Sequence, residues 1–485
     1  MPRNLREFRE AYDPAYKFEA VGTEHKRTLR PTHRWIITSA QNATPVDASW
    51  WSVLLNMASN LDAELLVIPL RYKNATSIWS GSQQNAEWWA PEVRPYLWNV
   101  RHALHPALTL LADIKAQPTA QSPLSGLEGI SGASHAVVAH TRVQLKTVPA
   151  GNGAKILTTT GACTVANYTS SRAGALGEFH HSLAAVLVEA DGDVVHIRNL
   201  HFDSDTASCI DLNVRYTADG SDTAPPALAI VLGDAHVDAI DPGVVSATWG
   251  ADGIVDALEP STLVWHDVFD GLSCNPHTRT DPIVAVSKTY AERSSVRAEV
   301  HRAIDFVASH TPRDSESVIV ASNHDDFLRR WLANQDWRTD PENAEFYLET
   351  ALAMVRQASG LGMSAETLSP FVHWVSAASV DRVRCLAPNE LFTLANVELG
   401  MHGDVGPNGA RGSIRNLRRV GAKSIVGHSH SPGIDEGCYQ VGTSSRLRLG
   451  YNRGPSGWMH AHVVLLANGK RQLIVMQNGK WRRST

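Results

Sequence analysis

Five aliphatic runs in the second half of the chain each end at a cluster of Asp, Asn and His, and this repeated pattern constrains the fold more than any other feature. The first run closes at Asp234-Ala-His236, and the others close at 266–270, 323–325, 402–404 and 427–430. Short apolar runs bounded by polar turns are typical of buried strands. Because the carboxyl ends of neighbouring strands meet at one edge of an α/β sheet, we expect the five clusters to form a single site.

The residue types in these clusters favour metal ions. Imidazole nitrogens with carboxylate and amide oxygens suit Mn, Fe, Co, Ni or Zn, and the clusters contain no thiolate for a softer metal. Seven ligands are too many for one tetrahedral zinc, but they fit two metals that share a carboxylate. The seven candidate ligands are Asp234, His236, Asp267, Asn323, His402, His428 and His430.

Length and composition exclude several classes of protein. A chain of 485 residues exceeds one ordinary core and predicts two or three domains. No apolar run approaches the ~20 residues of a membrane helix, and the charged start lacks the apolar core of a secretory signal. Five scattered cysteines without CxxC spacing favour free thiols. We therefore expect a cytoplasmic protein without membrane contact, whose net charge of -5 still permits a local basic groove.

The first half of the chain predicts an α/β domain. Apolar runs that alternate with helical segments argue for a largely parallel sheet. An Asp-Gly pair between two further runs predicts a hairpin. The expected elements are strands at 34–39, 64–70, 107–113 and 155–160, a helix at 47–60 capped by Asp47, and a hairpin of 182–190 with 193–200.

A segment of linker composition separates the two halves. Residues 216–226 are rich in Gly, Ser, Asp, Thr and Pro. The boundary divides the chain into an N-terminal arm, an accessory domain and a second domain in which helices and strands alternate. The ranges are 1–33 for the arm, 34–220 for the accessory domain and 227–485 for the second, with helices expected at 290–308 and 343–358 and strands near 460–476.

The ordered series Asp-x-His, Asp-x-x-Asp, Asn-His-Asp, His and Gly-His-x-His resembles that of the calcineurin-like metallophosphoesterase superfamily over residues 227–476. The resemblance implies a β-sandwich flanked by helices. It implies that His324 contacts the substrate phosphate or protonates the leaving oxygen, and that Asp325 orients His324. It also implies one metal held by Asp234, His236 and His430, a second held by Asn323, His402 and His428, and Asp267 as the bridge between them.

Two positions depart from the family pattern. His266 precedes Asp267 and Ser322 precedes Asn323, where the family has glycine. Neither substitution removes a ligand, so we expect metal binding to be retained. For His266 the alternatives are packing, a hydrogen bond to a ligand and direct ligation, whereas Asp270 is expected to support a ligand.

The predicted site suits hydrolysis of a phosphate ester. Two cations would polarise the phosphoryl oxygens and lower the pKa of a bridging water, so that a hydroxide attacks phosphorus in line. A nearby imidazole can protonate the departing alkoxide, and His324 is the candidate. We expect a two-metal phosphodiester hydrolase, with Mn²⁺ favoured and Fe, Zn, Co, Ni or Mg as alternatives.

The first half also bears on the substrate. Residues 34–220 lack a dinucleotide-binding or Walker motif, and their arrangement is similar to the N-terminal half of bacteriophage-encoded metallophosphoesterases expressed early in infection and linked to host DNA breakdown. The resemblance implies a DNA nuclease acting in the host cytoplasm. A phosphatase or small-molecule phosphodiesterase is the alternative, and a non-catalytic metal-stabilised binding or assembly module is a third.

Three other segments leave alternatives open. The aromatic stretch 79–98 predicts packing, within the first domain or between copies in a homo-oligomer, with stacking on bases as the alternative. The glycine-rich segment 403–412 is a candidate substrate-facing loop. The cationic run 415–419 predicts a solvated helix face, with a phosphate contact as the alternative.

Overall fold

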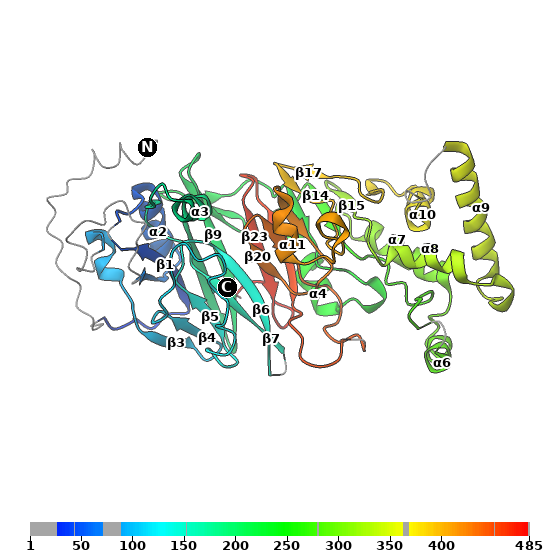
Figure 1. The fold of residues 1–485 in the computed structure, drawn as a ribbon, viewed down its shortest axis with the longest axis horizontal. Helices are drawn as coiled ribbons and strands as arrows, with labels where there is room; N and C mark the ends of the chain where they lie inside the picture. The colour runs from blue at the N-terminus through cyan, green and yellow to red at the C-terminus, as the bar shows by residue number, and fades with distance from the viewer. Residues whose placement is uncertain are drawn as a thin grey trace. The chain divides into compact units, whose positions relative to one another are not determined.

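The computed structural model describes residues 27–42, 44–70, 89–151, 153–278, 281–361, 368–450 and 452–483. The chain divides into two compact units, one formed by 1–224 with 482–485 and the other by 225–481 (Figure 1). Both units combine helices with sheets that contain parallel strands, so the predicted α/β class is confirmed. Most of the expected N-terminal arm and residues 79–88 of the aromatic stretch lie outside the described residues.

A seven-stranded sheet of order β12-β11-β10-β9-β8-β1-β2 organises the first unit. Among its described strands β1 and β2 pair parallel, and every other neighbouring pair is antiparallel. The strands are β1 (Arg34–Gln41), β2 (Glu64–Leu70), β8 (Ala184–Asp191), β9 (Val194–Asp203), β10 (Ser208–Asp211), β11 (Val214–Tyr216) and β12 (Ser221–Thr223).

The prediction of a largely parallel sheet for 34–220 is therefore wrong. The turns between β8 and β12 contain two to four residues, and a parallel crossover needs a dozen or more. The expected hairpin of β8 and β9 is present, with Gly192 at φ 61° in its turn. The expected linker at 216–226 contains β12, and the boundary between the units falls at Ala224.

A second group of strands in the first unit has the order β6-β7-β5-β4-β3. Its pairs β4–β5 and β5–β7 are parallel, whereas β3–β4 and β6–β7 are antiparallel. The sequence predicted β4 and β7 of this group. The strands are β3 (Arg101–His105), β4 (Leu108–Leu111), β5 (His135–Val138), β6 (Gln144–Ala150) and β7 (Gly153–Thr159).

Helix α2 (Ala48–Asn60) covers one face of the seven-stranded sheet. It begins where predicted, because the Asp47 side chain accepts a hydrogen bond of 2.9 Å from the Trp50 amide. The Trp50 ring lies 5.4 Å from that of Phe202 on β9. Trp89 is fully buried in the same core, so the described part of the aromatic stretch favours packing over base stacking.

Arg198 on β9 holds a buried positive charge between two carboxylates. Its Nε and Nη2 donate to Asp211 at 2.7 and 2.8 Å, and Nη1 lies 2.9 Å from Glu189. Arg198→Met would leave both carboxylates without this partner, so we expect the free energy of unfolding to fall by about 3–5 kcal/mol. The control is Arg215→Met, which breaks an exposed ion pair with Asp222. This control should change the free energy of unfolding by about 1 kcal/mol or less. Urea denaturation measures the free energy of unfolding of both variants. An equal decrease in the two variants would contradict a stabilising role for the buried Arg198 charge.

The second unit contains a six-stranded sheet of order β16-β15-β14-β13-β22-β23 and a five-stranded group of order β17-β18-β19-β21-β20. Strands β13 to β16 run parallel, as do β18, β19 and β21. The first sheet comprises β13 (Ala229–Val231), β14 (Thr262–Trp265), β15 (Glu316–Ile319), β16 (Val383–Cys385), β22 (His460–Leu465) and β23 (Arg471–Met476). The second comprises β17 (Thr393–Leu394), β18 (Val397–Glu398), β19 (Lys423–Val426), β20 (Gly433–Asp435) and β21 (Cys438–Gln440).

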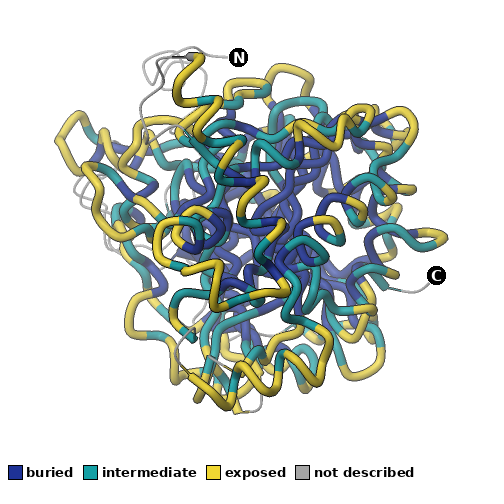
Figure 2. The backbone as a smooth tube through the Cα atoms, turned by 90° about the vertical axis from the view of Figure 1, so that its right-hand side faces the viewer, coloured by how far each residue is buried: buried dark blue, intermediate teal, exposed yellow. Residues whose placement is uncertain are grey.

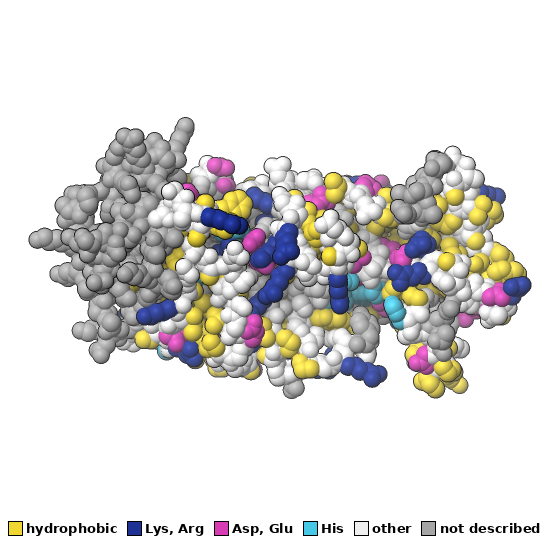
Figure 3. Space-filling view, viewed as in Figure 1, with side chains coloured by type: hydrophobic (Ala, Val, Ile, Leu, Met, Phe, Trp, Pro, Cys, Tyr) yellow, Lys and Arg dark blue, Asp and Glu magenta, His cyan; other side chains and the backbone are white. Residues whose placement is uncertain are grey.

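Most described helices of the second unit follow strands of the first sheet, whereas the short α11 (Ile414–Leu417) lies between β18 and β19 of the five-stranded group. The others are α4 (Pro242–Trp249), α5 (Ile254–Leu258), α6 (Pro282–Tyr290), α7 (Val296–Ser309), α8 (Asp325–Asn334), α9 (Ala344–Leu361) and α10 (Pro370–Ala378). The sequence predicted α7 and α9. Buried segments lie inside a layer of exposed loops and helix faces (Figure 2), while α6 presents Ile283, Val286 and Tyr290 to solvent (Figure 3). Among the described helices, none combines the length and apolar content needed to cross a bilayer.

Candidate metal centre

The five polar clusters lie at the carboxyl ends of β13, β14, β15, β18 and β19. Strands β13, β14 and β15 are parallel neighbours, so the segments after them leave the sheet at one edge. The same holds for β18 and β19 in the other sheet. Among the described residues, His and Asp side chains from these segments form three groups that could hold a metal ion. Two of the groups share Asp267, and the third consists of His236, Asp270 and His324. In each group the donor atoms all lie within 4.8 Å of one another.

The first group contains Asp234, His236, Asp267 and His430. Nε2 of His430 lies 3.1 Å from Oδ2 of Asp234 and 3.0 Å from Nε2 of His236. Nε2 of His236 is in turn 3.6 Å from Oδ2 of Asp267. All four side chains are buried, with Asp234 fully inaccessible to solvent. The imidazole and carboxylate atoms thus face a common point inside the unit.

The second group contains Asp267, His402 and His428, with Asn323 beside them. Nε2 of His402 lies 3.3 Å from Oδ2 of Asp267 and 3.1 Å from Oδ1 of Asn323. Nδ1 of His428 is 3.0 Å from the same Asn323 oxygen. The structure therefore brings all seven predicted ligands together, with Asp267 between the two groups.

Unsatisfied buried oxygens show that the donor set fits a cation. Oδ1 of Asp234 and Oδ1 of Asp267 are buried and accept no hydrogen bond from the described residues. A buried carboxylate oxygen without a partner is strongly destabilising. A divalent cation would satisfy both oxygens, and hard carboxylate oxygens with imidazole nitrogens are suitable ligands for it.

The backbone at the site is strained. His236, Asp267, His428 and His430 have φ values of 41°, 45°, 73° and 57°, in the left-handed region that residues with a Cβ rarely adopt. Such conformations cost of order 1–3 kcal/mol each and cluster at functional sites. Here they turn side chains from three loops toward the donor groups.

Gly427 allows the loop after β19 to approach the site closely. A Cβ at this position would lie 2.4 Å from Oδ1 of Asp234 and 2.9 Å from Cγ of His266. His266 is itself buried, and its Nδ1 lies 3.3 Å from Nδ1 of His402. Burial lowers the pKa of His266 to about 4, so the ring is neutral. The geometry favours contact with His402 over direct ligation.

Charges inside the site stabilise one another. Burial disfavours ionisation of Asp267, but the attraction of His402, His324 and His236 outweighs burial and holds the pKa of this carboxyl well below its usual value. Burial likewise disfavours a charged His402, yet Asp267 and Asp234 raise the pKa of His402 to about 9. Asp267 is thus a carboxylate across the neutral range.

Asp270 fixes the orientation of two histidines. Its Oδ1 accepts a hydrogen bond of 3.0 Å from Nδ1 of His236, which leaves the Nε2 lone pair of that ring facing the first group. Its backbone oxygen accepts a hydrogen bond of 2.7 Å from Nδ1 of His324. The expectation that Asp270 supports a ligand agrees with this geometry, whereas its contact with His324 had no signal in the sequence.

The predicted orienting role of Asp325 is not what the structure shows. Oδ2 of Asp325 accepts a hydrogen bond of 2.9 Å from the Ser322 amide, and Asp270 takes the place beside His324. Asp325 opens α8, so its side chain turns back toward the preceding loop. Burial raises the pKa of Asp325 to about 8. A carboxyl that is largely protonated near neutrality is poorly suited to orient a cationic imidazole.

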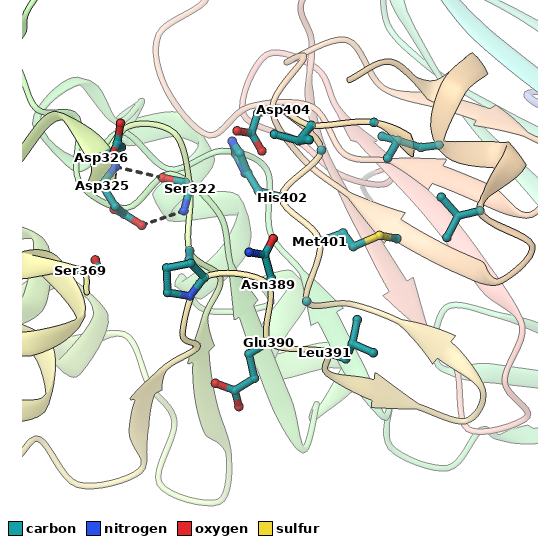
Figure 4. A pocket seen from close by; sticks show the side chains of 18 of the residues that line it. Ser322, Asp325, Asp326, Ser369, Asn389, Glu390, Leu391, Met401, His402 and Asp404 are labelled. Carbon is teal, nitrogen blue, oxygen red and sulfur yellow. Dashed lines mark hydrogen bonds between the residues drawn. The ribbon is translucent and has the colours of Figure 1, made fainter. Parts of the chain in front are cut away.

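A cavity of about 670 Å³ borders the second group (Figure 4). Ser322 and Asp325 lie on one side of it, joined by hydrogen bonds, while Met401 lies on the other and His402 and Asp404 lie close together at its edge. The glycine-rich segment after His402 contributes residues 403–407 to the lining. The candidate substrate-facing loop therefore borders a space beside a predicted ligand.

Other histidines have structural partners. Nδ1 of His462 accepts a hydrogen bond of 2.9 Å from the Gly233 amide, and its Nε2 lies 2.9 Å from Oγ1 of Thr248. Nε2 of His460 lies 3.0 Å from the Ser445 backbone oxygen. Both residues lie on β22, so these contacts tie that strand to its surroundings.

Comparison with known proteins identifies a relative that spans nearly the whole chain. The sequence is 30% identical to Protein A1 of Escherichia phage T5 over 486 residues, which cover 96% of this chain and 86% of the phage protein. No family model matches the sequence. No solved structure matches it either.

Proposed function

The chain belongs to the family of Protein A1 of Escherichia phage T5, and from that premise we propose that it is a metal-dependent phosphodiester hydrolase that cleaves DNA. We further propose that residues 225–481 form a calcineurin-like metallophosphoesterase domain. The observation that carries the proposal is the pair of buried donor groups that share Asp267. A carboxylate common to two groups of imidazoles is the arrangement that a pair of divalent cations requires.

The residues present fit two cations. Asp234, His236 and His430 would hold one and Asn323, His402 and His428 the other, with Asp267 between them. When bound, two cations of the Mn²⁺ type would neutralise charge on the phosphate and lower the pKa of the attacking water.

His324 is placed to deliver a proton to the leaving oxygen. Because Nδ1 donates to the Asp270 backbone oxygen, the exchangeable proton is carried at Nε2. The side chain is 17% exposed, and its ring centroid lies 4.7 Å from that of His236. The His324 side chain therefore lies between the first donor group and solvent, where an extended substrate can reach His324. The Asp270 carboxylate, with Oδ1 4.0 Å from Nδ1 of His324, would stabilise the cationic ring.

The substrate class rests on two supports. A relative from a phage spans the chain, and the first half resembles phage proteins linked to host DNA breakdown. A second candidate substrate is a small phosphate ester, because the cavity beside His402 is large enough for a small molecule.

Purified protein incubated with supercoiled and linear DNA in Mn²⁺, Mg²⁺ or EDTA tests the proposal, with p-nitrophenyl phosphate as the small ester. We expect Mn²⁺-dependent nicking of the circles and no cleavage in EDTA. Metal content measured on the same samples shows whether the site is loaded. Intact DNA under every condition, from protein that holds metal, would contradict nuclease activity, and turnover of the small ester alone would favour the second candidate.

A further inference from the structure

The last part of the chain carries positive charge without compensating acid. No Asp or Glu occurs after Glu436, and three arginines lie within eight residues at Arg446, Arg448 and Arg453. This run contrasts with the net charge of -5 for the whole protein. All three arginines are exposed, and none forms an ion pair with a carboxylate among the described residues. The described residues of 446–457, here called the arginine loop, thus present uncompensated charge to solvent.

The first end of the arginine loop is attached to the first donor group. The Ser444 amide donates to the Asp234 backbone oxygen at 2.8 Å, and Oγ1 of Thr443 donates to the same oxygen at 2.9 Å. The Arg446 amide donates to the Ala239 backbone oxygen at 2.9 Å, three residues beyond His236. The loop therefore begins beside the segment that carries two candidate ligands.

The second end returns to a third candidate ligand. The ring of Trp458 packs edge-on against that of His430 with centroids 4.1 Å apart. The Met459 amide donates to the His430 backbone oxygen at 3.1 Å. Both ends of the loop are thus fixed at the donor group that holds Asp234 and His430, and the loop extends from the second unit (orange-red in Figure 1).

Internal contacts give the loop a defined path. Nδ2 of Asn452 donates to the Leu447 backbone oxygen at 2.8 Å, and Oδ1 of Asn452 accepts from the Leu449 amide at 2.9 Å. Gly450 and Gly454 have φ values of 82° and 89°, which a residue with a side chain rarely adopts. A loop of twelve residues that returns to its start reaches at most about 20 Å from its base, enough to follow several phosphates of one strand.

We propose that the arginine loop binds the phosphate backbone of a DNA strand whose scissile phosphate lies at the donor groups. This inference rests on the proposed function and names a part of the surface that recognises its substrate. A small ester would not extend beyond the donor groups to the arginines, whereas a strand carries one charge for each nucleotide past the cleaved bond. The loop thus selects polymers over small phosphate esters.

The test variant combines Arg446→Gln, Arg448→Gln and Arg453→Gln. The control combines Arg313→Gln, Arg338→Gln and Arg356→Gln, which removes the same charge from exposed positions on other segments. Binding of a fluorescent 30-nucleotide strand is measured by anisotropy in EDTA. We expect the loop substitutions to raise Kd at least ~10-fold at low salt and to reduce the slope of log Kd against log salt by about 2. The control substitutions should change Kd less than ~3-fold. Loop and control variants with equal Kd would overturn the inference.

A second measurement separates this inference from the proposed function. The ratio of kcat/KM on DNA to that on bis(p-nitrophenyl) phosphate, measured with Mn²⁺, should fall at least ~10-fold in the loop variant and stay constant in the control. An unchanged ratio would overturn the inference. If the unmodified protein cleaves neither substrate, the proposed function fails, and the anisotropy measurement alone decides whether the loop binds DNA.

Discussion

Asp267→Asn should abolish metal-dependent cleavage, lowering kcat/KM on DNA and on bis(p-nitrophenyl) phosphate alike by at least ~10³-fold. The substitution removes the negative charge shared by the two donor groups while preserving the size of the side chain. Loss of about 4 kcal/mol of transition-state stabilisation corresponds to that factor. Steady-state rates with Mn²⁺ measure the effect.

Loss of metal must be distinguished from loss of fold. A ligand that binds the native state raises Tm, so Mn²⁺ should stabilise the unmodified protein against heat. Asp267→Asn should lose most of this increase while keeping the same circular dichroism spectrum. Asp326→Asn is the control, because Asp326 lies on α8, is paired with Arg329 and Arg330, and belongs to neither donor group. Full activity in Asp267→Asn would contradict the shared-carboxylate site.

His324→Ala should lower kcat on DNA by about 10²- to 10⁴-fold, the usual contribution of a general acid. The effect should depend on the leaving group. DNA releases an alkoxide that needs a proton, whereas p-nitrophenolate is stable without one. We therefore expect a much smaller loss on bis(p-nitrophenyl) phosphate, measured with the same enzyme preparation.

A matched control removes a neighbouring imidazole. His277 and His324 both pack against Phe327, with ring centroids 5.9 and 4.7 Å away. His277→Ala therefore removes a similar packing contact without removing the proton donor, and it should retain activity on both substrates. Equal losses on the two substrates in His324→Ala would argue for phosphate binding by His324 and against proton transfer.

The candidate site could be predicted from sequence because each candidate ligand lies within a few residues of the end of a strand. Asp234 and His236 follow one strand directly, and His428 and His430 follow another, so identifying the strands also locates the side chains. Parallel neighbours then bring the segments together. The role of Asp270 could not be predicted, because its contacts with His236 and His324 join residues 34 and 54 positions away.

The pairing within the first unit shows where sequence patterns fail. The apolar runs identified β1, β2, β4 and β7, and Asp47 marked the start of α2. A buried apolar run does not indicate whether the neighbouring strand runs parallel or antiparallel to it. The prediction of parallel strands rests instead on the alternation of apolar runs with helical segments. The short turns from β8 to β12 determine antiparallel order, and β10 to β12 are too short to give a clear periodic signal.

The position of β13 has a consequence for the order in which the candidate site is assembled. This strand carries Asp234 and His236 at its end, and it lies between β14 and β22 in the sheet. β22 begins at His460, after every one of the seven candidate ligands in the chain. Strand β13 therefore gains its second neighbour in the sheet only after all seven candidate ligands have been synthesised. For the hydrolase proposed above, the complete sheet behind the candidate ligands would form only once β22 has been made.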